Sequence, residues 1–280
     1  MKLGVHASIR GGVQSAPERA RDFGAECLQI FTKNQRRWEP SGPITDEEAE
    51  AFREQIDEHG YELADTFAHG SYLINVASDD DEQFDKSVDA LVTELERASK
   101  LDLLGVCFHP GSHKGAGEEF ALDRVVDGIE AALERSPDDT LLLVEGMPGA
   151  GTQVGDDLEH LAHWMDALPA DRVGLTLDTC HLFVAGYDLR PDAYEATMQD
   201  LASTIDLDRV ESWHLNDARH PYASAKDGHA AIGDGELGLA AFEALLSDER
   251  WAGLPASLET SPDTYETDLK RLRDVRSVDA

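Results

Sequence analysis

The chain has 280 residues, 57 of them acidic and 24 basic, which gives a formal net charge of -33 at pH 7. Hydrophobic residues make up 41 % of the sequence, which is too many for a disordered acidic chain. The sequence has no run of 18 apolar residues, which excludes a membrane-spanning helix, and residues 1–12 lack a signal-peptide pattern, so we expect a cytoplasmic protein.

Eight short apolar, β-rich runs recur along the chain, and each is followed by a stretch with helical periodicity. The predicted strands cover residues 2–6, 27–31, 63–69, 103–109, 140–145, 172–178, 209–215 and 255–259. The predicted helices cover residues 15–26, 46–60, 85–102, 120–136, 157–169, 192–205, 239–249 and 263–275.

Continuous apolar strands that alternate with helices predict a parallel sheet covered by helices. Eight such units favour an α/β fold of the (β/α)8 TIM-barrel type, with residues 1–280 in a single domain. A doubly wound open sheet is the alternative. Cys27 and Cys107 fall within predicted strands, and no CxxC spacing occurs, so we expect both to be small buried strand residues.

Metal-capable side chains end six of the eight predicted strands. From the third strand onward these are His69, His109, Glu145, Asp178, His214 and Glu259. The loops just after them add His181, Asp227 and His229. Because the active site of such a barrel lies at the carboxyl ends of its strands, we expect all nine side chains on one rim.

Four carboxylates and five imidazoles on one rim would repel one another, or lose much solvation, unless cations compensated them. Few Lys or Arg stand at these strand ends, whereas divalent metal ions compensate such charges directly. Nitrogen and oxygen ligands together suit zinc, with manganese or iron as alternatives. One zinc ion takes about four ligands, so the set predicts two or three ions with bridging carboxylates.

Two short motifs place these ligands in pairs. In "DTCH", Asp178 and His181 are three residues apart around a turn, so they can reach neighbouring ions. In "DGH", Asp227 and His229 are two residues apart, so both can reach one ion from an extended loop. His6, with His113 of "HPGSH", is a candidate for orienting a ligand or a phosphate.

The acidic residues are spread over the faces of the predicted helices and do not form a tail. This distribution predicts a folded protein with an acidic surface, as halophilic proteins use to stay soluble in concentrated salt. The alternative is an acidic surface that binds a basic partner.

At the candidate ligands the sequence closely resembles the endonuclease IV family of apurinic/apyrimidinic endonucleases. The resemblance covers nearly the whole chain and includes "FTKNQRRW" (31–38), "HGSYLIN" (69–75), "HPGSH" (109–113), "LDTCHLFVAGYDLR" (177–190), "HLNDA" (214–218) and "LET" (258–260). It implies a monomeric barrel with three Zn²⁺ ions that cleaves double-stranded DNA 5′ to an abasic site. The implied products are a 3′-hydroxyl and a 5′-deoxyribose phosphate, and trimming of blocked 3′ ends is a second implied activity. It implies no protein partner.

The resemblance also assigns roles to the candidate residues. By position in the family's motifs, one ion takes His69, His109 and Glu145, a second takes Glu145, Asp178, His214 and Glu259, and the third takes His181, Asp227 and His229. Glu145 would be catalytic as the bridge between two ions that activate a water molecule. Glu259 would be catalytic by steering the proton of that water.

DNA recognition is implied for two loops. Lys33, Gln35 and Arg37 lie in the first, and Tyr72 and Leu73 lie in the second. In the family these loops enter the minor groove and fill the gap left by the flipped abasic nucleotide, whose extrusion costs less because its stacking is already lost. A basic cluster in so acidic a chain favours such a role over an ordinary surface loop.

Two departures from the family pattern leave all nine ligand positions filled. After Glu145 the family usually reads Asn-Thr-Ala-Gly-Gln-Gly, whereas this chain has "GMPGAG" from Gly146 to Gly151. Between Asp227 and His229 the family usually has Arg, and this chain has Gly228, which removes a cation that could hold a phosphate. Lys226 and Arg219 are the candidates to replace it.

Two other functions fit part of this pattern. A metal-dependent sugar isomerase or epimerase shares the barrel and the metal-binding rim, but it needs one or two ions and a closed pocket, and no basic loop. A non-catalytic lesion-binding protein would need no complete set of nine ligands.

Overall fold

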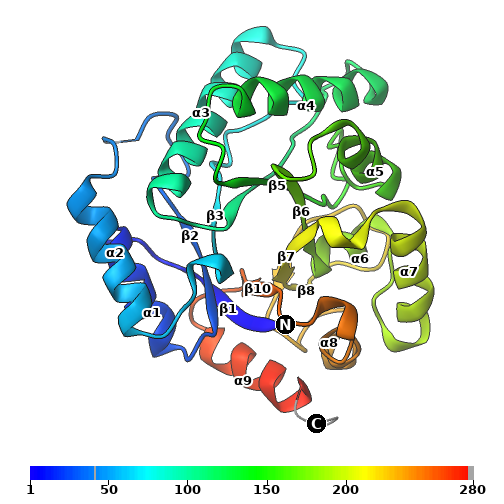
Figure 1. Cartoon of the computed structure of the whole chain (residues 1–280). Helices are drawn as coiled ribbons and strands as arrows, with labels where there is room; N and C mark the ends of the chain where they lie inside the picture. The colour runs from blue at the N-terminus through cyan, green and yellow to red at the C-terminus, as the bar shows by residue number, and fades with distance from the viewer. Residues whose placement is uncertain (41, 277–280) are drawn as a thin grey trace.

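The strands form one closed parallel barrel. The computed structural model describes residues 1–40 and 42–276. Eight strands pair in the order β1-β10-β7-β6-β5-β4-β3-β2. Figure 1 shows the barrel from one end. They are β1 (Lys2–Ala7), β2 (Cys27–Phe31), β3 (Thr66–His69), β4 (Gly105–Phe108), β5 (Leu141–Glu145), β6 (Val173–Asp178), β7 (Val210–Leu215) and β10 (Pro255–Leu258). The closed barrel confirms the predicted fold and excludes the open sheet.

Helices surround the barrel, as Figure 1 shows. Eight of them correspond to the predicted helices: α1 (Ala16–Asp22), α2 (Asp46–Glu58), α3 (Asp81–Lys100), α4 (Glu118–Leu133), α5 (Leu158–Ala167), α7 (Pro191–Thr204), α8 (Leu239–Leu246) and α9 (Tyr265–Arg276). No helix among the described residues is long and apolar enough to cross a membrane.

Helix α2 shows why these segments are helical. The Thr45 hydroxyl accepts a hydrogen bond from the Glu48 amide, and the Glu48 carboxylate accepts one from the Thr45 amide. Two backbone amides at the start of the helix thus have side-chain acceptors. Ala49, Phe52 and Ile56 follow at spacings of three and four residues and are buried against the barrel wall. The acidic residues of the helix are left on its outer face.

The structure differs from the predicted elements in three places. Residues 63–65 form a 3-10 turn, and the third strand begins only at Thr66. The predicted turn after Asp178 is a short helix, α6 (Thr179–Ala185), because the Asp178 carboxylate caps it by accepting the His181 amide at 2.8 Å. A two-stranded antiparallel ribbon, β8 (Asp217–Ala218) with β9 (His229–Ala230), follows β7.

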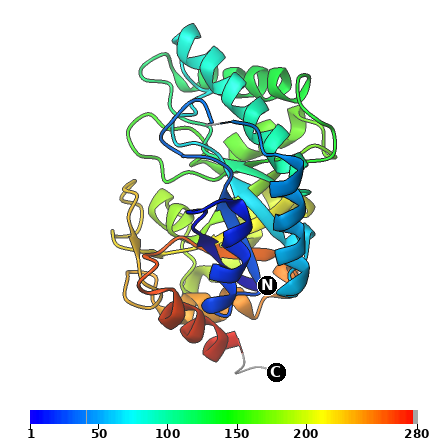
Figure 2. The same ribbon diagram turned by 90° about the vertical axis from the view of Figure 1, so that its left-hand side faces the viewer.

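Alternation along the strands determines what the barrel interior contains. Phe67, Cys107 and Leu143 are fully buried and form a small cluster of their own. Two residues further along the same strands come His69, His109 and Glu145, which therefore point the same way. The apolar layer lies beneath the polar one, and the polar layer opens at the carboxyl ends of the strands. Figure 2 shows long loops, coloured green and gold, that project on one side of the barrel.

A close approach between β1 and β2 requires glycine at position 4. Gly4 pairs with Cys27 in the parallel ladder, and a Cβ atom at Gly4 would overlap both the carbonyl oxygen and the Sγ atom of Cys27. The conflict involves backbone, so a rotamer change cannot relieve it.

We therefore expect Gly4→Ala to lower the free energy of unfolding by about 1–3 kcal/mol, the usual cost of overpacking. Gly42→Ala is the matched control, because a Cβ atom there meets nothing within 4 Å. Chemical denaturation of both variants measures the effect. An unfolding midpoint of Gly4→Ala equal to that of Gly42→Ala would contradict the packing argument.

Candidate metal centre

All nine predicted ligands lie at the carboxyl end of the barrel. Six end a barrel strand or stand within one residue of its end: His69 (β3), His109 (after β4), Glu145 (β5), Asp178 (β6), His214 (β7) and Glu259 (after β10). The other three lie on the segments that follow β6 and β7: His181 in α6, Asp227 in a loop and His229 in β9. The parallel topology thus brings together residues that are up to 190 positions apart in the sequence.

Glu145 lies at the centre of the cluster and is fully buried. Its Oε2 atom is 3.3 Å from His69 Nε2 and 3.1 Å from His109 Nε2. Its Oε1 atom is 3.0 Å from His214 Nδ1 and 3.2 Å from His181 Nδ1. One carboxylate therefore faces four imidazoles through two different oxygens, which is the arrangement that a bridging ligand needs.

A second group surrounds His214. Ligand atoms of Glu145, Asp178, His214 and Glu259 all lie within 4.8 Å of one another. His214 Nδ1 faces Glu145 and, at 3.4 Å, the Oε2 atom of Glu259. Three carboxylates and one imidazole around one point match the chemistry of a small divalent cation.

The third group is more open to solvent. Asp227 Oδ1 lies 3.5 Å from His181 Nε2 and 3.4 Å from His229 Nε2. Both Nε2 atoms are buried and have no hydrogen-bond partner among the described residues. Since buried polar atoms are normally satisfied, two orphaned nitrogens aimed at one carboxylate fit a site that a metal ion completes.

In His69 and His181, the Nδ1 atom already makes a hydrogen bond to a backbone carbonyl, and this bond determines the tautomer of each ring. His69 Nδ1 donates to the Gly70 carbonyl at 2.8 Å, and His181 Nδ1 donates to the Gly146 carbonyl at 2.9 Å. The Nε2 lone pairs are therefore free to face the centre of the cluster. Such hydrogen bonds orient the ring and raise its basicity as a ligand.

Gln29 sets the tautomer of His214 and was not predicted. Its amide nitrogen donates to Glu259 Oε1 at 2.6 Å, so its amide oxygen must face His214 Nε2, also at 2.6 Å. That contact places the proton on Nε2 and leaves Nδ1 free for a ligand role. The signal in the sequence was a polar residue at an inward position of an apolar strand, two residues before the strand end.

Asn216 and Asp217 hold the segment that carries the ligands after β7. The Asn216 amide donates to Asp178 Oδ2 at 2.6 Å, and its oxygen accepts the Glu259 backbone amide at 3.1 Å. Asp217 is buried and accepts backbone amides of Gly233, Gly235 and Leu237, which shapes the loop after His229. Both residues fall within the "HLNDA" segment, but their roles depend on contacts that the sequence does not reveal.

Opposite charges within the cluster shift the pKa values of Glu145 and His214. Burial raises the pKa of Glu145, but His214 and His109 outweigh burial and hold that pKa well below its usual range. Burial lowers the pKa of His214, but Glu259 and Glu145 outweigh burial and raise that pKa to about 9. A divalent cation would displace these protons, since imidazole must be neutral to bind it.

Cys107 lies beneath Glu145, with its Sγ atom 3.4 Å from Oε2. Burial first, and the Glu145 charge second, raise the pKa of this thiol well above its usual range, so the thiol stays protonated and donates to the carboxylate. Cys27 and Cys107 are both buried strand residues, as predicted.

The predicted recognition loops lie against each other beside the cluster. The Ser71 hydroxyl donates to the Gln35 carbonyl at 2.8 Å, which ties the two loops together. Tyr72 is 52 % exposed, and the inner side of its ring packs on His69 and His109 at centroid distances of 5.4 and 6.0 Å. Arg37 is exposed and Leu73 is half-buried. An exposed aromatic ring fixed on two candidate ligands is well placed to contact a substrate.

Lys33 departs from the prediction that it contacts DNA. Its side chain is buried, its ammonium lies 3.3 Å from Glu94, and it donates to the carbonyls of Arg37 and Trp38 at 3.0 Å each. The nonpolar stem and the charged head are both enclosed, so Lys33 holds the shape of the loop and presents no donor to solvent.

The two sequence departures have structural consequences. Gly146 supplies the carbonyl that orients His181, so the role belongs to backbone and does not need the family's side chain. A Cβ atom at Gly228 would lie 3.0 Å from the His220 ring, so a larger residue would displace that ring. Arg219 donates to the His229 carbonyl at 3.1 Å, whereas Lys226 makes no such contact among the described residues.

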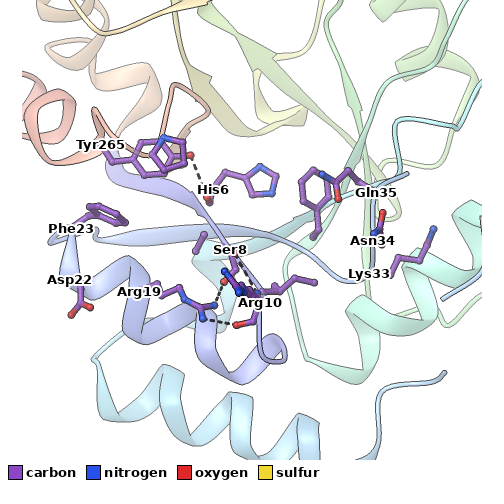
Figure 3. A pocket seen from close by; sticks show the side chains of 14 residues that line it. His6, Ser8, Arg10, Arg19, Asp22, Phe23, Lys33, Asn34, Gln35 and Tyr265 are labelled. Carbon is purple, nitrogen blue, oxygen red and sulfur yellow. Dashed lines mark hydrogen bonds between the residues drawn. The ribbon is translucent and has the colours of Figure 1, made fainter. Parts of the chain in front are cut away.

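A cavity of about 640 Å³ adjoins the cluster on the side of β1 and β2. Figure 3 shows His6, Gln35, Tyr265 and Arg19 among the residues that line it, and Arg19 donates to the carbonyls of Ser8 and Arg10. His6 Nδ1 is 2.8 Å from the Gln29 amide nitrogen and 3.4 Å from Glu259, so this cavity opens beside the second group of candidate ligands. His113, by contrast, accepts the amides of Gly115 and Gly117 and shapes its own loop.

Comparison with known proteins places the chain among related sequences and folds. Residues 17–275 match the family model described as a xylose isomerase-like TIM barrel. A "Probable endonuclease 4" of Chloroflexus aurantiacus is 42 % identical over 262 residues, covering 92 % of this chain and 91 % of that protein. One from Halorhodospira halophila is 41 % identical over 278 residues, covering 97 % and 93 %.

Solved structures give the same result. Endonuclease IV from Thermus thermophilus superposes with a TM-score of 0.86 at 33 % identity and covers 98 % of each chain. A D-tagatose 3-epimerase-like protein reaches a TM-score of 0.71 at 20 % identity, covering 99 % of this chain and 98 % of that one, and so shares the fold alone. Because the family model spans most of the sequence and relatives above 40 % identity cover nine-tenths of it, the chain belongs to the endonuclease IV family of enzymes.

Proposed function

We propose that this protein is a DNA-repair endonuclease that cleaves the phosphodiester 5′ to an apurinic/apyrimidinic site in double-stranded DNA, leaving a 3′-hydroxyl and a 5′-deoxyribose phosphate. Trimming of blocked 3′ ends is a second activity of the same site. The observation that carries the proposal is the single buried carboxylate, Glu145, facing four imidazoles at the barrel rim. The relatives named endonuclease 4 support DNA cleavage as the reaction of this site.

Three Zn²⁺ ions, or Mn²⁺ as the alternative, fit the three groups described above. His69 and His109 with Glu145 would hold one ion, Asp178, His214 and Glu259 with Glu145 a second, and His181, Asp227 and His229 the third. When bound, such ions supply Lewis-acid activation of water and neutralise charge on a phosphate. The orphaned Nε2 atoms of His181 and His229 are the best local support for this assignment.

The protein's own residues would organise the reaction. Glu145 and Asp178 are fully buried, whereas the Glu259 side chain is 13 % exposed and is the carboxylate of the second group that substrate can reach. Glu259 is also held by Gln29 at Oε1, and its Oε2 faces His214 Nδ1 at 3.4 Å, so the carboxylate is fixed at the place where it would steer the proton of an attacking water. Glu145 faces His69 and His109 with one oxygen and His214 with the other, so it would fix the first and second groups of ligands relative to each other.

Recognition would rest on the two linked loops. Tyr72, Leu73, Gln35 and Arg37 lie where a distorted minor groove would meet the rim, and Tyr72 can take the place of the missing base in the stack. Lys33 acts indirectly by holding the loop that carries Gln35 and Arg37. We propose that the enzyme works as a monomer in the cytoplasm.

A sugar isomerase or epimerase is the competing function. An epimerase-like protein shares the barrel with this chain at low sequence identity. In this chain, however, Tyr72 and the loop that carries Arg37 are exposed at the rim, which leaves the rim open to a large substrate. Cleavage of an abasic-site oligonucleotide with and without chelator, measured beside a ketose epimerisation assay, separates the two.

We expect the purified protein to hold close to three divalent ions, and Glu145→Gln to lose at least one of them. Turnover should fall by more than about 100-fold, because outer partners of metal ligands alone cost about 10–100-fold. Elemental analysis, cleavage assays and circular dichroism make the test, with the exposed Glu159→Gln on α5 as control. One ion per wild-type chain, or near-normal turnover in Glu145→Gln, would overturn the trinuclear assignment.

We expect Tyr72→Ala to weaken binding to an abasic duplex by about tenfold, since stacking of one base on an aromatic ring is worth about 1–3 kcal/mol. Arg37→Ala should also weaken it, and both variants should keep their metal content. Phe120→Ala removes a similarly exposed ring on α4 and should change nothing. The assignment of the recognition loops fails if both variants bind abasic duplex as wild type does.

We further propose that the acidic surface is a halophilic adaptation. At a net charge of -33 the fold repels itself and its substrate in dilute salt, and molar salt shortens the Debye length to about 3 Å. Folding and cleavage should therefore persist into molar KCl and weaken when salt is withdrawn. Cleavage against KCl concentration, with circular dichroism on the same samples, measures this. A sharp activity maximum near about 0.1 M with the protein still folded above it would instead favour an acidic surface for a basic partner.

A further inference from the structure

Helix α3 carries a row of polar side chains on an inward face. The acidic residues Asp85, Asp89 and Glu96 of this helix are exposed, as expected of an acidic surface, whereas Glu94 is only 1 % exposed. Glu94 belongs to a set of polar residues at successive spacings of four, seven and three, which places them on one face of the helix. We call this set the α3 polar stripe; it comprises Gln83, Ser87, Glu94 and Arg97.

Glu94 holds the first recognition loop through a buried ion pair. Its Oε1 atom lies 3.3 Å from the Lys33 ammonium, and its Oε2 atom accepts the Thr32 hydroxyl at 2.6 Å. The same ammonium donates to the carbonyls of Arg37 and Trp38 at 3.0 Å each. An ammonium has three donors, so Lys33 spends all of them on joining α3 to the two sides of the loop.

Arg97 anchors the same loop one turn further along α3. Its Nε and Nη2 atoms donate to the Thr32 carbonyl at 3.2 and 2.6 Å, and its Nη1 atom donates to the Gly42 carbonyl at 2.7 Å. Residues 34–37, which carry Gln35 and Arg37, lie between these two anchor points in the sequence. One guanidinium therefore fixes the chain before and after the segment assigned to recognition.

The amino-terminal half of the stripe holds the second recognition loop. The Gln83 side-chain amide donates to the Leu73 carbonyl at 2.9 Å, and the Ser87 hydroxyl accepts the backbone amide of Asn75 at 2.9 Å. Ser87 is fully buried, and its hydroxyl donates in turn to the Gln83 carbonyl at 2.7 Å. These bonds fix the backbone directly after Tyr72, so one helix supports both loops.

We propose that the α3 polar stripe sets the geometry of both recognition loops before DNA binds, and that Glu94 and Gln83 are positioning residues for substrate binding. This proposal rests on the proposed function. A buried ion pair stabilises a fold little more than well-packed apolar side chains would, so the main consequence of the pair between Glu94 and Lys33 is the loop shape that it imposes. Loops that are ordered in advance lose less conformational entropy when they bind.

The stripe should affect binding without affecting the metal centre. Among the described residues, no hydrogen bond or ion pair joins a residue of the stripe to a candidate metal ligand. Loss of a stripe contact should therefore weaken the complex with DNA and leave the rate of the chemical step close to the wild-type value.

The test compares Glu94→Gln and Gln83→Ala with Glu96→Gln, which removes the same charge from the outer face of the same helix. The metal-loaded proteins bind a duplex with a cleavage-resistant abasic analogue, and single-turnover cleavage is measured at saturating enzyme. We expect the Kd to rise about tenfold in Glu94→Gln and about fivefold in Gln83→Ala, which correspond to the loss of a charged and a neutral hydrogen bond. Glu96→Gln should match wild type, and all three variants should keep their metal content.

Two further measurements separate positioning from a purely structural role. Amide hydrogen exchange without DNA should become faster at residues 32–38 in Glu94→Gln and at residues 70–75 in Gln83→Ala. The double variant Lys33→Met, Glu94→Leu removes both buried charges, so it should remain folded by circular dichroism. Its Kd should nevertheless stay raised, because Met cannot donate to the carbonyls of Arg37 and Trp38.

A wild-type Kd in both Glu94→Gln and Gln83→Ala overturns the proposal, as does a wild-type Kd in the double variant. An equal rise of the Kd in Glu96→Gln, or a rise that accompanies loss of metal, also overturns it, because net charge or the metal centre would then be the cause. A wild-type protein that neither binds nor cleaves abasic duplex overturns the proposed function instead. Hydrogen exchange needs no DNA, so it would still decide whether the stripe holds the loops.

Discussion

The structure depends on the burial of a carboxylate among imidazoles. An isolated ionised Glu145 inside the barrel mouth would be very costly, and a cluster of neutral rings alone would leave nitrogens unsatisfied. When they lie together, the negative carboxylate and the imidazoles stabilise one another. The nitrogen and oxygen atoms that still lack a partner are suited to bind divalent ions. The surrounding hydrogen bonds from Gln29, Asn216 and two backbone carbonyls serve this arrangement, because each of them determines which atom of a ligand faces inward.

The barrel makes such a cluster possible through simple alternation. Parallel strands bring their carboxyl ends to one rim, and a period of two residues separates an apolar layer, with Phe67 and Cys107, from the polar layer above it. The apolar layer closes the barrel below the polar one. The polar groups then meet solvent from one side only, which is where the loops stand that would receive DNA.

Much of this could be predicted from the sequence. Apolar runs followed by helical periodicity indicated the barrel, and the polar residues that end those runs indicated the cluster, because strand ends and rim positions coincide in this fold. Three features could not be predicted. The helix α6 depends on a side-chain cap at Asp178, Gln29 gains its role from partners on β7 and after β10, and Lys33 turns inward because Glu94 of α3 lies opposite it. Each of these contacts depends on which segments lie side by side in the folded chain, and the periodicity of one segment does not predict that.

The double use of Asp178 has a consequence for how this position can vary in evolution. One carboxylate oxygen caps α6 and the other faces Asn216 and the second group of candidate ligands. Asn would keep the helix cap but remove the negative charge, and Glu would keep the charge but set its oxygens too far from the first turn of the helix. Since local folding and the chemistry of the site select the same side chain for different reasons, drift at this position meets two independent barriers. A substitution that preserves only one of the two roles of Asp178 still loses the other.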